Sequence, residues 1–148
     1  MKPDPTRFLA VAAGHLLTHT VGALGPGYEQ SSVSVMGLVL TSVAEEFERA
    51  AERRVAENRE LRRIFAAAEE VVASGALREK LACAARGEDT SLSVSELERG
   101  NADLRSLLIE LHAHVEELDS EQSRKIEQEI WRELVASTER RRLAIGPF

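Results

Sequence analysis

All four histidines of this 148-residue chain lie in two short segments, GHLLTHT at 14–20 and ELHAHVEE at 110–117. His15 and His19 in the first segment are four residues apart, so on a helix they share one face, with about 5–6 Å between their Cβ atoms. Two neutral imidazoles at that separation supply half of the tetrahedral ligand shell of zinc. The first segment therefore predicts half of a metal site.

The second segment adds one histidine and two carboxylates to this hypothesis. His112 and His114 are two residues apart and lie on opposite flanks of a helix, so they cannot grip one ion together. His114 shares its flank with Glu110 and Glu117, which lie about one turn before and one turn after it. If that flank faces the first helix, one of these carboxylates completes a zinc or iron site. The predicted metal ligands are His15, His19, His114, Glu110 and Glu117.

The same histidines also fit a second interpretation, in which they pack within helices or pair with acids at the surface. The zinc-protease pattern H-E-x-x-H and the Glu-x-x-His pairs of di-iron bundles are absent, as is the G-x-S-x-G nucleophile elbow. The glycine-rich GALGPG at 22–27 lacks the preceding strand and following lysine of a phosphate-binding loop. Cys83 has apolar spacing in a short helical segment and is expected to be a buried, inert thiol. These observations favour a protein that is not an enzyme.

The composition limits which classes of partner and which cellular compartment we expect. The net charge is −6 and basic residues interleave with acidic ones, which argues against nucleic acid as the partner. The single cysteine cannot form an intrachain disulfide, so we expect a reducing cytoplasm. Asp4 and two prolines disfavour an export signal, and the apolar stretch 8–24 is too short and polar to span a membrane. Arginine outnumbers lysine, which indicates a GC-rich, bacterial genome.

Strong helix formers dominate the chain, and the apolar residues recur with helical period, which predicts an all-α protein. The expected helices cover about 5–24, 28 or 32 to 73, 76–86, 94–118 and 120–143. Their starts carry capping signals: Asp4 before Pro5, Ser93 with Glu96 in a capping box, and Asp119 or Ser120. The long second helix is expected to bend or break at 52–60, where its seam becomes polar. Short connections favour antiparallel neighbours, so we predict one antiparallel helical-bundle domain, 1–148, with four main helices and one short one.

The first helix is apolar nearly all round, so it needs cover on more than one side. Because residues 33–43 also carry a second apolar face, we predict a homo-oligomer, most simply a dimer, built through 8–24 and 33–43. The leading hypothesis is a non-enzymatic, self-associating accessory or interaction module. One alternative is a metal-binding bundle, extending to a metal-dependent enzyme. Another is a binder of hydrophobic small molecules, with a pocket lined by Tyr28, Phe47, Phe65 and Trp131.

Two segments resemble each other: NRELRRIF at 58–65 and NADLRSLL at 101–108 share Asn, Leu, Arg and two apolar positions. Duplication of a helical hairpin and chance both explain this similarity. Asn58 and Asn101 lie on or beside apolar seams, where a buried polar residue can fix the register of packed helices. The three arginines at 140–142 complement the dipole of the last helix at its C-terminus.

Overall fold

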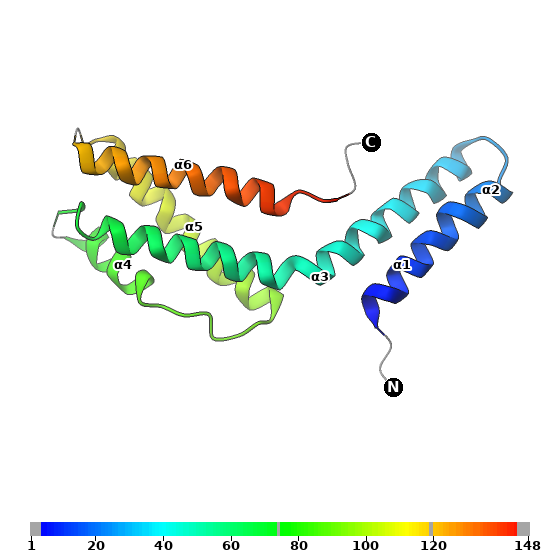
Figure 1. Ribbon diagram of the computed structural model, residues 1–148, viewed down its shortest axis with the longest axis horizontal. Helices are drawn as coiled ribbons and strands as arrows, with labels where there is room; N and C mark the ends of the chain where they lie inside the picture. Colours follow the sequence, from blue (N-terminus) through cyan, green and yellow to red (C-terminus); the bar gives the residue numbers. More distant parts are fainter. Residues whose placement is uncertain (1–3, 74, 119, 145–148) are drawn as a thin grey trace. The chain divides into compact units, whose positions relative to one another are not determined.

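The computed structural model describes residues 4–73, 75–118 and 120–144, and in these ranges the chain is all-α, as predicted (Figure 1). The helical elements are α1 (Pro5–His15), the π-helical segment η1 (Leu16–Thr20), α2 (Val21–Ala23), α3 (Tyr28–Ala68), α4 (Ala76–Ala85), α5 (Val94–Glu116) and α6 (Glu121–Arg141). Because α1, η1 and α2 follow one another without a break, they form the predicted first helix.

The chain divides into two compact units. The hairpin unit comprises residues 1–50 and 143–148, of which 4–50 and 143–144 are described, and the bundle unit comprises residues 51–142. Helix α3 contributes its first part to the hairpin unit and its second part to the bundle unit. The sequence-based expectation of one domain over 1–148 stays a prediction.

In the hairpin unit, local signals set the ends of the helices. Asp4 is the N-cap of α1 and its carboxylate accepts a hydrogen bond from the Arg7 backbone N–H at 3.3 Å, while Pro5 occupies the first turn. Both features confirm the prediction. After α2 the chain turns at 25–27, and the Gln30 side-chain amide donates to the carbonyls at the end of the first arm, Val21 O at 3.2 Å and Leu24 O at 3.4 Å. A side chain in the first turn of α3 thus bonds to the end of the first arm and stabilises the turn.

The two arms of the hairpin approach each other closely at Gly37. A Cβ atom placed on this buried glycine would lie 2.6 Å from Leu17 Cγ on the opposite arm. Real Cβ atoms do not approach other carbons so closely, so any larger residue at position 37 must displace Leu17 or separate the arms. Glycine costs an α-helix about 0.8–1.0 kcal/mol relative to alanine, and here that cost is offset by the contact.

We expect Gly37→Leu to destabilise the hairpin unit by about 1–3 kcal/mol, as overpacking of a tight contact does. Gly14→Leu is the matched control, because it makes the same change in a helix where a Cβ atom meets nothing within 4 Å. Urea unfolding followed by circular dichroism reads both units, whereas the fluorescence of Trp131 reads the bundle unit. Only Gly37→Leu should shift the dichroism transition to lower urea, with the Trp131 transition unchanged; equal behaviour of the two variants would contradict the prediction.

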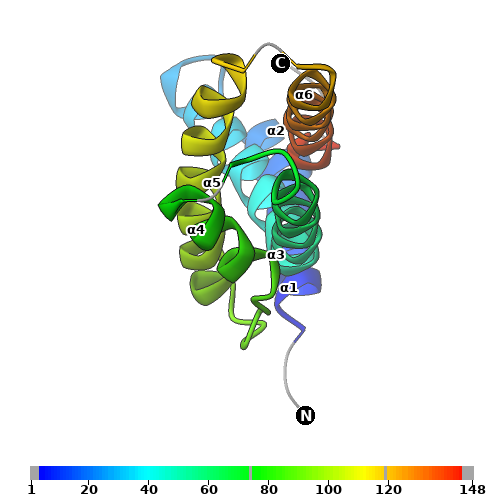
Figure 2. The same cartoon turned by 90° about the vertical axis from the view of Figure 1, so that its left-hand side faces the viewer.

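In the bundle unit, α3, α4, α5 and α6 surround one apolar core (Figure 2). Its fully or nearly fully buried members come from all four helices and include Leu61, Ile64, Phe65, Leu81, Leu104, Leu111, Ile126 and Ile130. Each such side chain stabilises the fold by about 1.5–3 kcal/mol when it leaves water. This core makes a helical bundle, as the sequence predicts. Helix α6 runs antiparallel to α3, whereas α5 runs in the same direction as α3, because α4 and the loop after it lead the chain back (Figure 1).

Several predicted details need correction. Helix α3 continues through 52–60 without a break, because the buried polar residues Glu57 and Asn58 are hydrogen-bonded by α5, α6 and the loop before α5. It ends at Ala68 rather than Ala73. Ser93 is the N-cap of α5 but makes no capping hydrogen bond, since its hydroxyl lies 2.9 Å from that of Ser95 and Glu96 pairs with Arg99. The predicted capping box at Ser93 is therefore wrong.

A capping box does begin α6, where Ser120 and Ser123 exchange hydrogen bonds between side chain and backbone. Ser120 was one of the two predicted caps; the other, Asp119, lies outside the described residues. Cys83 is exposed rather than buried. It lies two residues from the buried Leu81, and this spacing places it on the opposite side of α4.

Candidate functional site

A buried carboxylate, Glu57 on α3, is the centre of a polar cluster within the bundle unit. Its side chain is only 1% exposed. It accepts hydrogen bonds from Arg141 Nε at 2.9 Å and Nη2 at 2.8 Å, and from Ser137 Oγ at 2.9 Å, both on α6. Arg54 Nη1 at 3.1 Å on α3 and Asn101 Nδ2 at 3.3 Å on α5 also donate to it. One carboxylate thus ties three helices together.

Asn58, fully buried beside Glu57, extends this cluster toward the loop before α5. Its carbonyl oxygen accepts from Asn101 Nδ2 at 2.9 Å, and its own amide donates to Asp89 Oδ1 at 3.0 Å. Asp89 Oδ1 also accepts a hydrogen bond from Arg62 Nη2 at 2.7 Å. The two asparagines singled out by the sequence therefore contact each other, and this arrangement is what a register-fixing polar pair requires.

The electrostatics of the cluster favour an ionised Glu57. Burial alone would raise its pKa, but hydrogen bonds from Arg141 and Ser137 and the charges of Arg141 and Arg54 outweigh burial and lower the pKa from 4.5 to about 2. For Glu133, which forms an ion pair with Arg140, burial is the largest influence and raises the pKa. Arg140 and Arg141, expected to complement a helix dipole, are thus partners of acidic side chains.

The space around Glu57 is too small for a substrate. The cavity that reaches it has a volume of about 10 Å³, and Leu61, Leu108 and Leu134 are among the residues that line it. One water molecule needs roughly 10–15 Å³. An ionised carboxylate with all of its oxygens hydrogen-bonded and no room for a reactant is a structural group rather than a general base.

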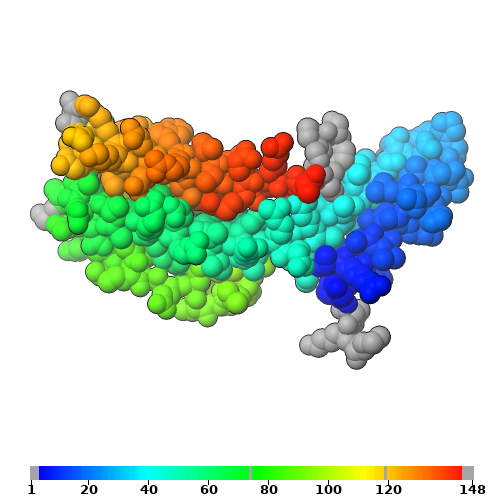
Figure 3. Space-filling view, in the orientation of Figure 1, coloured from blue at the N-terminus to red at the C-terminus, as the bar shows by residue number. Residues whose placement is uncertain are grey.

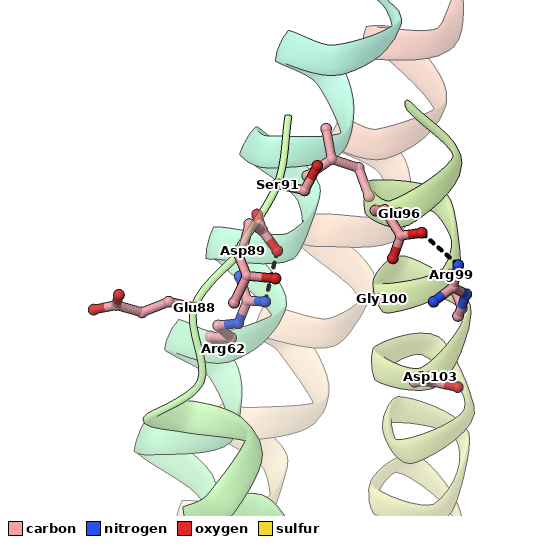
Figure 4. Close-up of a pocket in the computed structure, with 10 residues that line it drawn as sticks. Arg62, Glu88, Asp89, Ser91, Glu96, Arg99, Gly100 and Asp103 are labelled. Atoms are coloured by element: carbon pink, nitrogen blue, oxygen red, sulfur yellow. Dashed lines mark hydrogen bonds and ion pairs between the residues drawn. The ribbon is translucent and has the colours of Figure 1, made fainter. Parts of the chain in front are cut away.

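A larger cavity of about 220 Å³ opens between the 88–91 loop and the first turns of α5 (Figure 4). Both arginines of its walls have an acidic partner, Arg62 with Asp89 at 2.7 Å and Arg99 with Glu96 at 2.5 Å. Two more acids, Glu88 and Asp103, also line the cavity, so its acidic side chains outnumber its basic ones.

The hairpin unit exposes apolar side chains, whereas the cluster and the cavity of the bundle unit are polar. Among its described residues, the buried hydrophobic side chains are the alanines Ala13, Ala44 and Ala50. Seven of its larger apolar side chains, two on α1 and five on α3, are exposed by 45–69%, and we call them together the hairpin face: Phe8, Val11, Val35, Met36, Val39, Val43 and Phe47. On α3 these residues recur every three or four positions, which makes a stripe along the helix. The hairpin unit is the blue-to-cyan part of Figure 3.

The start of α1 and the middle of α3 lie side by side in the hairpin unit. Thr6 Oγ1 donates to Glu48 at 3.2 Å, which places the start of α1, near Phe8, beside the segment of α3 that carries Phe47. Between Phe8 and Ala44 the sequence contains a single Asp, Glu, Lys or Arg, namely Glu29. The hairpin face is therefore apolar along most of its length, with charged neighbours only at its Phe8 and Phe47 end.

The predicted metal ligands fall in both units. His15 and His19 in the hairpin unit are exposed, with ring centroids 5.2 Å apart, so the predicted one-turn pairing is present. In the bundle unit, Glu110 is engaged by Lys80 at 2.8 Å, Glu117 is exposed, and the Nε2 atom of His114 is buried without a hydrogen-bond partner among the described residues. The joint site of these five residues stays a prediction.

The aromatic residues proposed for a small-molecule pocket differ strongly in exposure. Tyr28 is 88% exposed, whereas Phe65 is completely buried in the bundle core. A residue sealed in the core cannot line an accessible pocket, so Phe65 has a packing role. The hypothesis of a hydrophobic ligand loses this member and stays untested for the others.

One group of side chains on α5 and α6 was not expected from the sequence. His112, Glu116 and Glu127 bring one potential ligand atom each to within 4.8 Å of one another. The sequence predicts no ligand role for His112, because it lies on the opposite flank of the helix from His114. Its real neighbours come from the next turn of α5 and from α6, and a contact between helices cannot be read from spacing within one helix.

No protein-family model, no curated protein and no solved structure matches this chain. Among the helices described, none is both long and apolar enough to cross a membrane. Functional inference therefore depends on the geometry of this molecule.

Proposed function

We propose that this chain is a non-enzymatic, self-associating helical module whose hairpin units pack together in a homodimer. The observation that carries the proposal is the hairpin face, an exposed apolar surface on a unit whose described buried hydrophobic residues are all alanines. Two helices alone cannot cover their large apolar side chains. Exposed apolar surface of this extent is typical of an interaction site.

A second copy of the chain fits this surface better than a charged partner. Seven side chains exposed by 45–69% offer on the order of 700 Å² of apolar surface per copy, close to the roughly 800 Å² that each partner buries in a stable interface. A two-fold interface sets the same patch against itself, and apolar side chains can meet in that way without leaving charges unpaired. Two helical hairpins packed face to face make a four-helix bundle.

The bundle unit supports a non-catalytic role. The buried carboxylate of Glu57 is held by hydrogen bonds, and both arginines that line the cavity beside the 88–91 loop are paired with acids. The lone Cys83 favours a reducing cytoplasm as the compartment.

Light scattering on size-fractionated, untagged protein tests the proposal. We expect a species of twice the 16.3 kDa chain mass at micromolar concentration. A monomer over the whole micromolar range would contradict it. A monomer that floats with anionic phospholipid vesicles would identify a lipid surface as the cover of the hairpin face and would equally overturn the dimer.

The second candidate function is metal binding by His15 and His19, which the 5.2 Å separation of their rings favours. Metal content measured on the same size-fractionated peak tests this proposal. Zinc, iron or manganese in near-integral ratio, lost when both histidines are replaced by alanine, is the expected result. Metal-free protein that takes up no zinc would contradict it.

A further inference from the structure

Beyond the hairpin face, the group that stands out is the His112, Glu116 and Glu127 cluster of the bundle unit. His112 and Glu116 are one turn apart on α5, with His112 Nε2 3.6 Å from Glu116 Oε1. Glu127 comes from α6, and the three ligand atoms all lie within 4.8 Å of one another. His112 and Glu127 are half-buried while Glu116 is exposed, so the cluster lies at the edge of the α5–α6 contact.

The His112 ring packs against Trp131, but among the described residues its Nε2 atom has no hydrogen-bond partner. The Trp131 ring of α6 meets the His112 ring edge-on, with centroids 5.4 Å apart and an interplanar angle of 85°. The Nε2 atom is buried and has no hydrogen-bond partner among the described residues. A buried polar atom without a partner costs about 1–3 kcal/mol, and a bound cation would remove that cost.

The ligand set suits a divalent transition-metal ion. Zinc binds imidazole nitrogen and carboxylate oxygen at about 2.0–2.2 Å in a tetrahedron, which places neighbouring ligand atoms roughly 3.3–3.5 Å apart. The 3.6 Å separation of His112 Nε2 and Glu116 Oε1 is close to that value. One neutral imidazole and two carboxylates would balance the charge of a divalent ion and leave one position for water.

We propose that His112, Glu116 and Glu127 bind one divalent transition-metal ion, with zinc as the best match, and that the ion links α5 to α6. This site uses none of the five ligands predicted from the sequence. It is also independent of the dimer, because all three residues belong to the bundle unit. Since His112 is on α5 and Glu127 is on α6, a bound metal ion should hold the two helices together and raise the stability of the fold.

The test uses untagged full-length protein in which His15 and His19 are replaced by alanine, so that the hairpin pair cannot bind. Isothermal titration with zinc chloride should show one site per chain, and zinc should raise the melting temperature. Copper(II) is the second probe: bound next to His112, it should quench the fluorescence of Trp131, the only tryptophan.

Three further substitutions, each made in the protein that lacks His15 and His19, test whether the three residues bind zinc. His112→Ala and Glu127→Gln should each weaken zinc binding at least tenfold and abolish the thermal shift. His114→Ala is the matched control, since His114 also has an unpartnered Nε2 but lies on the other flank of α5, and it should leave both readings unchanged. Glu127→Gln keeps the side-chain shape, so it remains informative if His112→Ala disturbs folding.

The proposal is overturned by any of three results. One is the absence of zinc binding at 100-fold excess over micromolar protein. The second is binding that survives Glu127→Gln in full, and the third is binding that is lost with His114→Ala.

Discussion

Replacement of Glu57 by alanine is expected to lower the free energy of unfolding of the bundle unit by about 3–5 kcal/mol, the range measured when one partner of a buried ion pair is removed. The substitution removes the acceptor of hydrogen bonds from Arg141, Ser137, Arg54 and Asn101 at once. Most domains are stable by only about 5–15 kcal/mol, so the loss is a large part of the total. Urea unfolding followed by Trp131 fluorescence measures it.

Glu57→Gln is the matched control, because it keeps the shape and one acceptor oxygen but removes the charge. We expect a loss of about 1.5–3 kcal/mol, the value of a hydrogen bond to a charged group. Glu133→Gln is a second control at a buried carboxylate whose pKa is raised by burial, and it should cost less than Glu57→Gln. If Glu57→Ala and Glu133→Gln destabilise the bundle equally, the cluster is not centred on Glu57.

The pH dependence gives an independent measure of the same cluster. The pKa of Glu57 falls from 4.5 to about 2 on folding, so the unfolded state binds a proton more readily than the folded state. The resulting stabilisation, about 3 kcal/mol, is present in full above about pH 4.5 and is lost as the pH falls toward 2. Burial of Glu133 acts in the opposite direction. The unsubstituted chain should have a higher free energy of unfolding than Glu57→Gln at neutral pH. This difference should shrink as the pH falls from about 4.5 to about 2.

The helices could be predicted from the sequence because their ends depend on neighbouring residues. Asp4 with Pro5 and the serine at 120 mark helix starts through local hydrogen bonds and fixed backbone angles. Ser93 shows the limit of such signals. The S-x-x-E spacing is present, but Ser95 and Arg99 compete for the two side chains and the box does not form.

The polar cluster could be predicted only in part. Asn58 and Asn101 were recognised because they interrupt apolar seams, and the similarity between 58–65 and 101–108 aligns these same two residues, which contact each other at 2.9 Å. Glu57 was not recognised, since a glutamate among charged neighbours resembles a solvated helix face. Its partners at 137 and 141 lie 80 or more residues away, and no periodicity within one helix reveals such a contact.

His112 illustrates the same limit for a candidate site. Spacing within α5 excludes a joint role with His114, and this conclusion stands. Spacing cannot show that Trp131 and Glu127 of α6 lie against His112. Contacts between helices depend on crossing geometry, which is set by the whole core.

Introducing charge into the hairpin face should separate the proposed dimer while leaving the bundle unit intact. Val39 and Val43 are exposed in the single chain, so Val39→Glu with Val43→Glu causes no clash there. In a face-to-face dimer, four carboxylates would meet in apolar surroundings without partners. Desolvation of even one such group costs several kcal/mol, so we expect the dissociation constant to rise at least about 100-fold, equivalent to roughly 2.7 kcal/mol.

The matched control is Ile109→Glu with Val135→Glu, which places two charges on exposed apolar residues of the bundle unit. Sedimentation velocity from 1 to 100 µM should show a monomer for the hairpin variant and a dimer for the control, with the same Trp131 unfolding transition in both. Dissociation by the control alone would move the interface to α5 and α6. A dimer that withstands both variants would show that the hairpin face is not buried by a second copy, and its apolar stripe would then need a different partner.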